Sequence, residues 1–115
     1  MKPIVTVTNI FPQIALNRLA PTCELKTNES GISPTIDELG RMVSESDAII
    51  SYLSDRIDRD IIAQATKLKI IANYGAGFNN IDVTYACQKG IWVTNTPSVL
   101  HETTADLTWA MILGA

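Results

Sequence analysis

Residues 68–82 read LKIIANYGAGFNNID and join an apolar run to a turn with two glycines and then to the start of a helix. The run 68–74 is almost continuous in apolar residues, which is typical of a parallel strand covered by helices on both faces. Asp82 can cap a helix over 83–89, and Gly90 can end that helix in the left-handed conformation. The stretch is therefore a β-then-α unit, which indicates an α/β domain.

The same alternation continues in both directions along the chain. We expect strands at 4–8, 23–26, 47–53, 68–74 and 91–94. We expect helices at 13–20, after the capping box Thr35 to Glu38, at 59–66 with Asp58 as its cap, at 83–89 and at 102–113. The helix after the capping box should bury Ile36, Leu39 and Val43 on one face. This pattern predicts a five-stranded parallel sheet with helices on both faces, a three-layer α/β/α fold.

The composition is that of an ordinary single domain. The 115 residues are 46% hydrophobic and 18% charged, so a packed core can form. A net charge of −3 without a basic stripe argues against nucleic acid as a partner. With no signal peptide and no apolar run of about 18 to 20 residues, we expect no membrane association and a cytoplasmic protein. Cys23 and Cys87 lack C-x-x-C spacing and are expected to be reduced, buried thiols.

The turn at 75–77 is the strongest candidate for a binding site. Gly75 and Gly77 have no Cβ, so the backbone can take positive φ and present successive N–H groups to an anion such as carboxylate or phosphate. A dinucleotide fingerprint would need a third glycine where Asn80 stands, which argues against that interpretation. On the local pattern alone, a tight strand-to-helix turn without any ligand is an equally good explanation.

Other polar groups favour structural explanations. His101 has no partner carboxylate suited to acid/base work, and Glu102 and Asp106 lie near a helix start, where the dipole stabilises acids. The acidic residues at 55, 58 and 60 alternate with arginines at 56 and 59, which is typical of a solvated, salt-bridged face. We therefore predict no metal site.

The last expected helix is apolar around most of its circumference, and the sequence stops soon after it at Gly114 and Ala115. Such a helix needs cover on every side. A homodimer interface would provide cover, and so would the remainder of a longer protein. We favour the longer protein, because exposed apolar patches of that size are uncommon on monomers.

Residues 68–82, 89–97 and 102–108 closely resemble the D-isomer-specific 2-hydroxyacid dehydrogenases, which include glyoxylate reductases and phosphoglycerate dehydrogenases. The resemblance covers the whole chain and is most specific from 68 to 113. It implies a flavodoxin-like substrate-binding domain at residues 1–101. Residues 102–115 would begin the helix that leads to a Rossmann NAD(P)-binding domain outside this chain.

The resemblance also implies roles for particular residues. The backbone of Gly75, Ala76 and Gly77 would hold the substrate carboxylate, Tyr52 and Leu53 would shape the pocket, and Thr104 would lie beside the cofactor. Family members commonly have Asp at the position of Asn79, so the side-chain hydrogen bonds of this loop should differ from theirs.

The reaction implied is hydride transfer between NAD or NADP and a small 2-oxo or 2-hydroxy acid. The family's catalytic Arg, Glu and His lie outside this chain, and His101 does not match that His. We therefore expect no catalytic residue here, no activity and no tightly bound dinucleotide for the chain alone, and self-association or a homodimer through helix 102–115. A free-standing or engineered flavodoxin-like module that acts as a binding, interaction or scaffold domain is the alternative.

Overall fold

The computed structural model describes residues 2–28 and 30–96. Its strands are β1 (Ile4–Val7), β2 (Glu24–Thr27), β3 (Ala48–Tyr52), β4 (Ile70–Tyr74) and β5 (Trp92–Thr94). Its helices are α1 (Gln13–Leu19), α2 (Ile36–Glu45), α3 (Arg59–Ala63) and α4 (Val83–Gln88). Each expected strand is found within two residues of its predicted bounds, while α3 ends three residues earlier than predicted. The expected helix 102–113 lies outside the described residues.

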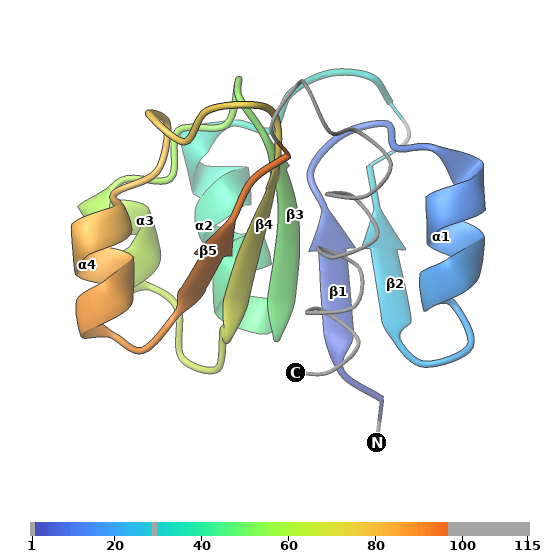
Figure 1. Ribbon diagram of the computed structural model, residues 1–115, viewed down its shortest axis with the longest axis horizontal. Helices are drawn as coiled ribbons and strands as arrows, with labels where there is room; N and C mark the ends of the chain where they lie inside the picture. The colour runs from blue at the N-terminus through green and yellow to red at the C-terminus, as the bar shows by residue number, and fades with distance from the viewer. Residues whose placement is uncertain (1, 29, 97–115) are drawn as a thin grey trace.

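All five strands are parallel and lie in the order β2-β1-β3-β4-β5 (Figure 1). This is the flavodoxin-like order, in which ligands bind beyond the carboxyl ends of the strands. Alternate residues of the central strands face opposite layers. Ile49 and Ile71 pack in the core under α2, α3 and α4, whereas Ile50 and Ala72 belong to the core that includes α1. The predicted three-layer fold is confirmed.

Local signals set the helix bounds as expected. Thr35 and Glu38 form both bonds of the capping box, and Asp58 and Asp82 cap α3 and α4. Gly90 follows α4 with a φ of 76°. Side-chain caps thus fix the starts of α2, α3 and α4, whereas α1 begins after Pro12 without one.

One prediction about helix α2 is wrong. Leu39 and Val43 are buried, but Ile36 is 68% exposed. Ile36 is the first residue of the helix, one turn before Leu39, and it lies beyond the packed core although it is on the same side of the helix axis.

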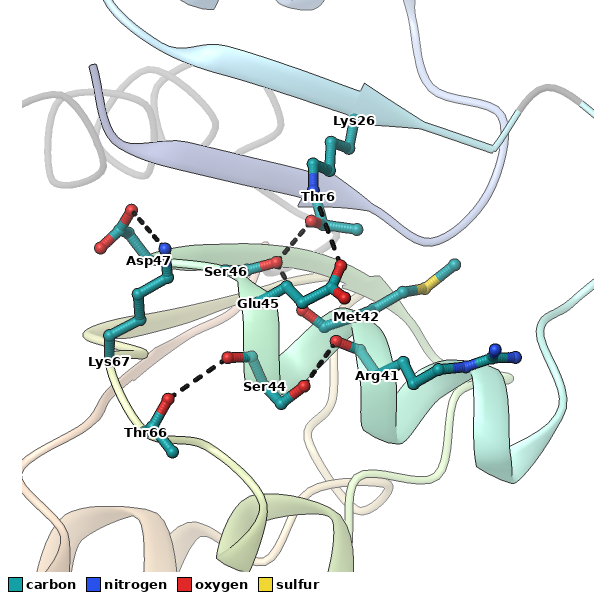
Figure 2. Close-up of polar contacts among 10 residues, drawn as sticks. All are labelled: Thr6, Lys26, Arg41, Met42, Ser44, Glu45, Ser46, Asp47, Thr66 and Lys67. Carbon is teal, nitrogen blue, oxygen red and sulfur yellow. Dashed lines mark hydrogen bonds and ion pairs between the residues drawn. The ribbon is translucent and has the colours of Figure 1, made fainter. Parts of the chain in front are cut away.

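Polar bonds tie the end of α2 to the amino-terminal part of the sheet (Figure 2). The buried hydroxyls of Ser46 and Thr6 are hydrogen-bonded to each other, and Ser46 also donates to the carbonyl of Met42. Thr66 donates to the carbonyl of Ser44 at 3.3 Å. The amino-terminal edge is thus fixed by internal bonds, and the loops at the opposite edge carry the candidate site. No helix within the described residues is long and apolar enough to cross a membrane.

Candidate functional site

The loops that follow β3 and β4 lie side by side at the carboxyl edge of the sheet. Tyr52 pairs in register with Tyr74 at the last positions of these two strands. One residue further on, Leu53 packs so closely over Gly75 that a Cβ atom there would overlap with it. The structure therefore brings together the two regions that the sequence had placed at the site, residues 52–53 and residues 75–77.

The glycines of the loop serve a different purpose from the one predicted. Among the described residues only Gly31 and Gly90 have positive φ, so the expectation of positive φ at Gly75 and Gly77 is wrong. Gly75 is required because Leu53 approaches it closely, whereas a Cβ atom on Gly77 would meet no atom within 4 Å. Both glycines thus keep space free above the backbone instead of allowing a left-handed turn.

The N–H groups of the loop are only partly free. Gly75 donates its N–H to the carbonyl of Asn73 at 3.1 Å, so this amide is directed into the protein. The N–H groups of Ala76 and Gly77 have no hydrogen-bond acceptor within the described part of the chain. The resemblance assigns the backbone of Gly75, Ala76 and Gly77 to the substrate carboxylate, and of these three residues only Ala76 and Gly77 have an N–H group without an acceptor in the described part of the chain. Backbone N–H groups left without a partner beside an open space are suited to an anion.

A pair of asparagines, one buried and one half-buried, holds the two loops together. Asn73 is 1% exposed, and it exchanges hydrogen bonds with Asn80 at 3.1 and 3.2 Å. The amide nitrogen of Asn80 also donates to the carbonyls of Tyr52 at 3.0 Å and Asp55 at 2.8 Å. Asn80 thereby links the loop after β4 to the loop after β3. This pair was not predicted from the sequence, although Asn73 within an apolar strand was a visible signal.

Asp55 departs from its predicted environment. It is 2% exposed instead of lying on a solvated face. One carboxylate oxygen accepts the N–H of Tyr52 at 2.8 Å and the hydroxyl of Thr8, while the other has no hydrogen-bond partner. The loop after β3 folds back over the sheet and carries Asp55 inward. Arg56 and Asp58 do form an exposed ion pair at 3.7 Å, as the pattern predicted.

An aromatic cluster forms the side of the site nearest β1. The ring centroids of Phe11 and Tyr74 lie 5.1 Å apart, and those of Tyr52 and Tyr74 lie 5.4 Å apart. The hydroxyl of Tyr52 donates to the carbonyl of Ile10. Burial, followed by the proximity of Tyr74 and Asp55, raises the pKa of Tyr52 to about 12. The Tyr52 phenol is therefore neutral at physiological pH and acts as a hydrogen-bond donor.

Several apolar side chains remain exposed around this edge: Ile10, Ile32, Leu53, Tyr74 and Phe78. These side chains, here called the apolar rim, lie on the loops and strand ends at the same carboxyl edge of the sheet as the amides of Ala76 and Gly77. Such a combination, a few polar groups set in apolar surroundings, is typical of small-molecule sites.

The remaining sequence predictions concern the two cysteines, a metal site and residues 101–106. Cys23 is buried as expected, but Cys87 is exposed, because it follows the buried Ala86 on α4 and turns to solvent. No cluster of metal-ligating residues is found in the described ranges. Thr104, His101 and the acids at 102 and 106 lie outside the described residues.

The sequence and the fold match one family of proteins. A sequence profile described as the catalytic domain of the D-isomer-specific 2-hydroxyacid dehydrogenases matches residues 4–111. The chain belongs to this family, and it corresponds to part of the substrate-binding domain. This assignment does not favour the alternative of a free-standing scaffold module.

Individual relatives agree with the assignment. A glyoxylate reductase from Pyrococcus horikoshii is 42% identical over 115 residues, covering 98% of this chain and 34% of the relative. A solved Thermus thermophilus protein has 38% identity and a TM-score of 0.78, with 96% of this chain and 36% of that chain covered. A Sinorhizobium meliloti glyoxylate/hydroxypyruvate reductase, solved with NADP and malonate, has 26% identity and a TM-score of 0.66 over 99% of this chain and 34% of that chain. The chain thus spans about a third of the length of these relatives.

Proposed function

We propose that this chain supplies the carboxylate-binding half of the active site of an NAD(P)-dependent D-2-hydroxyacid dehydrogenase. The observation that carries the proposal is the pair of N–H groups at Ala76 and Gly77, which have no acceptor in the described part of the chain and lie beside the open space at Gly77. The substrate would be a small 2-oxo or 2-hydroxy acid. Malonate, a small carboxylate, is bound in the Sinorhizobium meliloti relative.

The described residues can bind and orient such a substrate. Two backbone N–H groups aimed at one carboxylate hold it without a counter-charge, through charge-assisted hydrogen bonds. The apolar rim at Leu53 and the aromatic cluster would contact the remainder of the acid and exclude water. Tyr52, neutral and bonded to Ile10, keeps the rim in place and offers no negative charge to the anion.

The loop does not fit the pyrophosphate of a dinucleotide. Such a loop needs a third glycine for close approach to the cofactor, and this position is occupied by Asn80, whose side chain is engaged in bonds to Tyr52 and Asp55. A Rossmann domain formed by other parts of the enzyme would hold the cofactor, which would donate a hydride to a 2-oxo acid as NADH or NADPH and accept one from a 2-hydroxy acid as NAD or NADP.

Under this proposal, residues 1–101 form the substrate-binding domain and residues 102–115 begin the interdomain helix, with Thr104 beside the cofactor. The enzyme would be a cytoplasmic homodimer, or would self-associate through residues 102–115, without a nucleic acid partner. The isolated chain would bind a small carboxylate, hold no dinucleotide and catalyse no hydride transfer. The domain bounds, the role of Thr104, the location and the oligomeric state are proposed from the sequence and its family resemblance alone.

The direct test is nuclear magnetic resonance of the ¹⁵N-labelled chain titrated with glycolate. We expect downfield shifts of the Ala76 and Gly77 amide protons, with a dissociation constant on the order of 1 to 10 mM, since two hydrogen bonds act without an arginine. The uncharged analogue glycolamide is the control and should give much smaller shifts. Equal responses to both compounds, or none at these two amides, would refute the proposal.

A further inference from the structure

We propose that Asn95, which follows β5, is a positioning residue that turns the Gly77 amide of the 75–77 loop toward the substrate, and that Asn73, in β4, fixes the next peptide unit, 77–78, in the same way. The inference rests on the proposed function and explains how the loop offers N–H groups instead of carbonyls. Neither residue touches the carboxylate in this scheme. Each donates a hydrogen bond to a loop carbonyl and thereby fixes the orientation of that peptide unit, including its N–H group.

The carbonyls of three successive peptide units are held by donors. The carbonyl of Gly75 accepts from the backbone N–H of Thr96 at 2.8 Å. The carbonyl of Ala76 accepts from the Asn95 side-chain amide at 2.8 Å, and the carbonyl of Gly77 accepts from the Asn73 side-chain amide at 2.9 Å.

These hydrogen bonds to the carbonyls also determine the direction in which the N–H groups point. In a trans peptide the C=O of one residue and the N–H of the next point in opposite directions, and no cis bond occurs in the described chain. The N–H of Gly77 therefore points away from Asn95, because the carbonyl of Ala76 points toward it. By the same reasoning the N–H of Ala76 points away from Thr96, and the N–H of Phe78 points away from Asn73.

The loop needs such anchors because of its own composition. Glycine permits large changes of φ and ψ at little cost, and Gly75 and Gly77 flank Ala76 on both sides. A rotated 76–77 peptide would direct the Ala76 carbonyl dipole at the substrate and repel its carboxylate. The bond from Asn95 selects the orientation that attracts an anion.

Asn95 is the more informative of the two residues. Asn73 is buried and also bonds to Asn80 and Ser51, so its removal would disturb the fold. Asn95 is partly exposed and lies just beyond the last strand. Its substitution should leave the sheet intact.

The experiment compares Asn95→Ala with the wild-type chain in the glycolate titration. Asn17→Ala is the matched control, since Asn17 is an exposed asparagine on α1 bonded to Gln13 and far along the chain from the loop. We expect Asn95→Ala to weaken glycolate binding about tenfold, the scale of one hydrogen bond to a charged group. The Gly77 amide should lose most of its shift, while the Ala76 amide, whose plane is anchored by the backbone of Thr96, should keep its response at saturation.

The selective loss at Gly77 distinguishes positioning from a general loosening of the loop. An unchanged affinity, or an equal loss of response at Ala76 and Gly77, would overturn the positioning role while leaving the proposed function intact. If the wild-type chain itself shows no glycolate response at these amides, the proposed function fails and the positioning role fails with it.

Discussion

Gly75 lies directly beneath the side chain of Leu53: a Cβ atom at position 75 would come within 2.6 Å of Leu53 Cγ. The contact joins the loop after β3 to the loop after β4, which are separated by more than twenty residues in the sequence. It fixes the position of the 75–77 loop relative to Leu53. The glycine is thus explained by packing, without any appeal to a left-handed backbone.

Gly75→Ala should destabilise the chain by about 1 kcal/mol, because Leu53 must turn away from the new methyl group. The cost is modest because Leu53 is 55% exposed and can adopt another rotamer. Urea unfolding of Gly75→Ala, Leu53→Ala and the double variant gives the coupling energy between the two positions. A coupling energy near zero would show that the two side chains do not compete for the same space.

Gly77→Ala should behave differently from Gly75→Ala. A methyl group at 77 meets no protein atom within 4 Å, so the free energy of unfolding should change by no more than about 0.5 kcal/mol. The same methyl group would stand beside the N–H groups assigned to the carboxylate, so glycolate affinity should fall about tenfold. Glycolate titration of a stable Gly77→Ala chain with undiminished affinity would argue against a ligand at this loop.

Tyr52 should ionise only at high pH. The folded-state pKa of about 12 lies above the ordinary value of 10.0, so the folded chain holds the phenolic proton more tightly than the unfolded chain does. This contribution to stability is complete below pH 10 and is lost as the pH rises toward 12. Phenolate absorbance of the wild type should include a component near pH 12 that Tyr52→Phe lacks, and the stability difference between the two chains should narrow over the same range. A wild-type titration identical to that of Tyr52→Phe near pH 12 would contradict the assignment.

The fold was predictable from local patterns in the sequence. Apolar or β-branched runs mark every strand except β2, whose sequence ELKT gives only a weak signal. Thr35, Asp58 and Asp82 mark the starts of α2, α3 and α4, because capping bonds join residues only three apart. The order of the strands was implied by the family resemblance. These features need no knowledge of which loops meet in space.

The support of the site was not predictable in the same way. The burial of Asp55 depends on how its loop folds over β1, where Thr8 donates to it. The bonds of Asn80 depend on the strand register that places Tyr52 opposite Tyr74. The glycine pattern predicted the turn after β4 but suggested positive φ for its glycines, and the charge pattern assigned Asp55 to solvent.

Asn80 and Asn79 are neighbours in the sequence, but substitution of Asn80 should reduce stability far more than substitution of Asn79. Asn80 donates to the carbonyls of Tyr52 and Asp55 and exchanges bonds with the buried Asn73, so Asn80→Ala would leave several buried polar groups without partners. We expect a loss of about 2 to 3 kcal/mol in the free energy of unfolding, measured in urea. Asn79 is exposed, and Asn79→Ala should change stability by no more than about 0.5 kcal/mol. If the proposed function holds, Asn80→Ala should also weaken glycolate binding, because the loops after β3 and β4 would no longer be held together. Equal effects of the two substitutions would show that Asn80 does not join the loops.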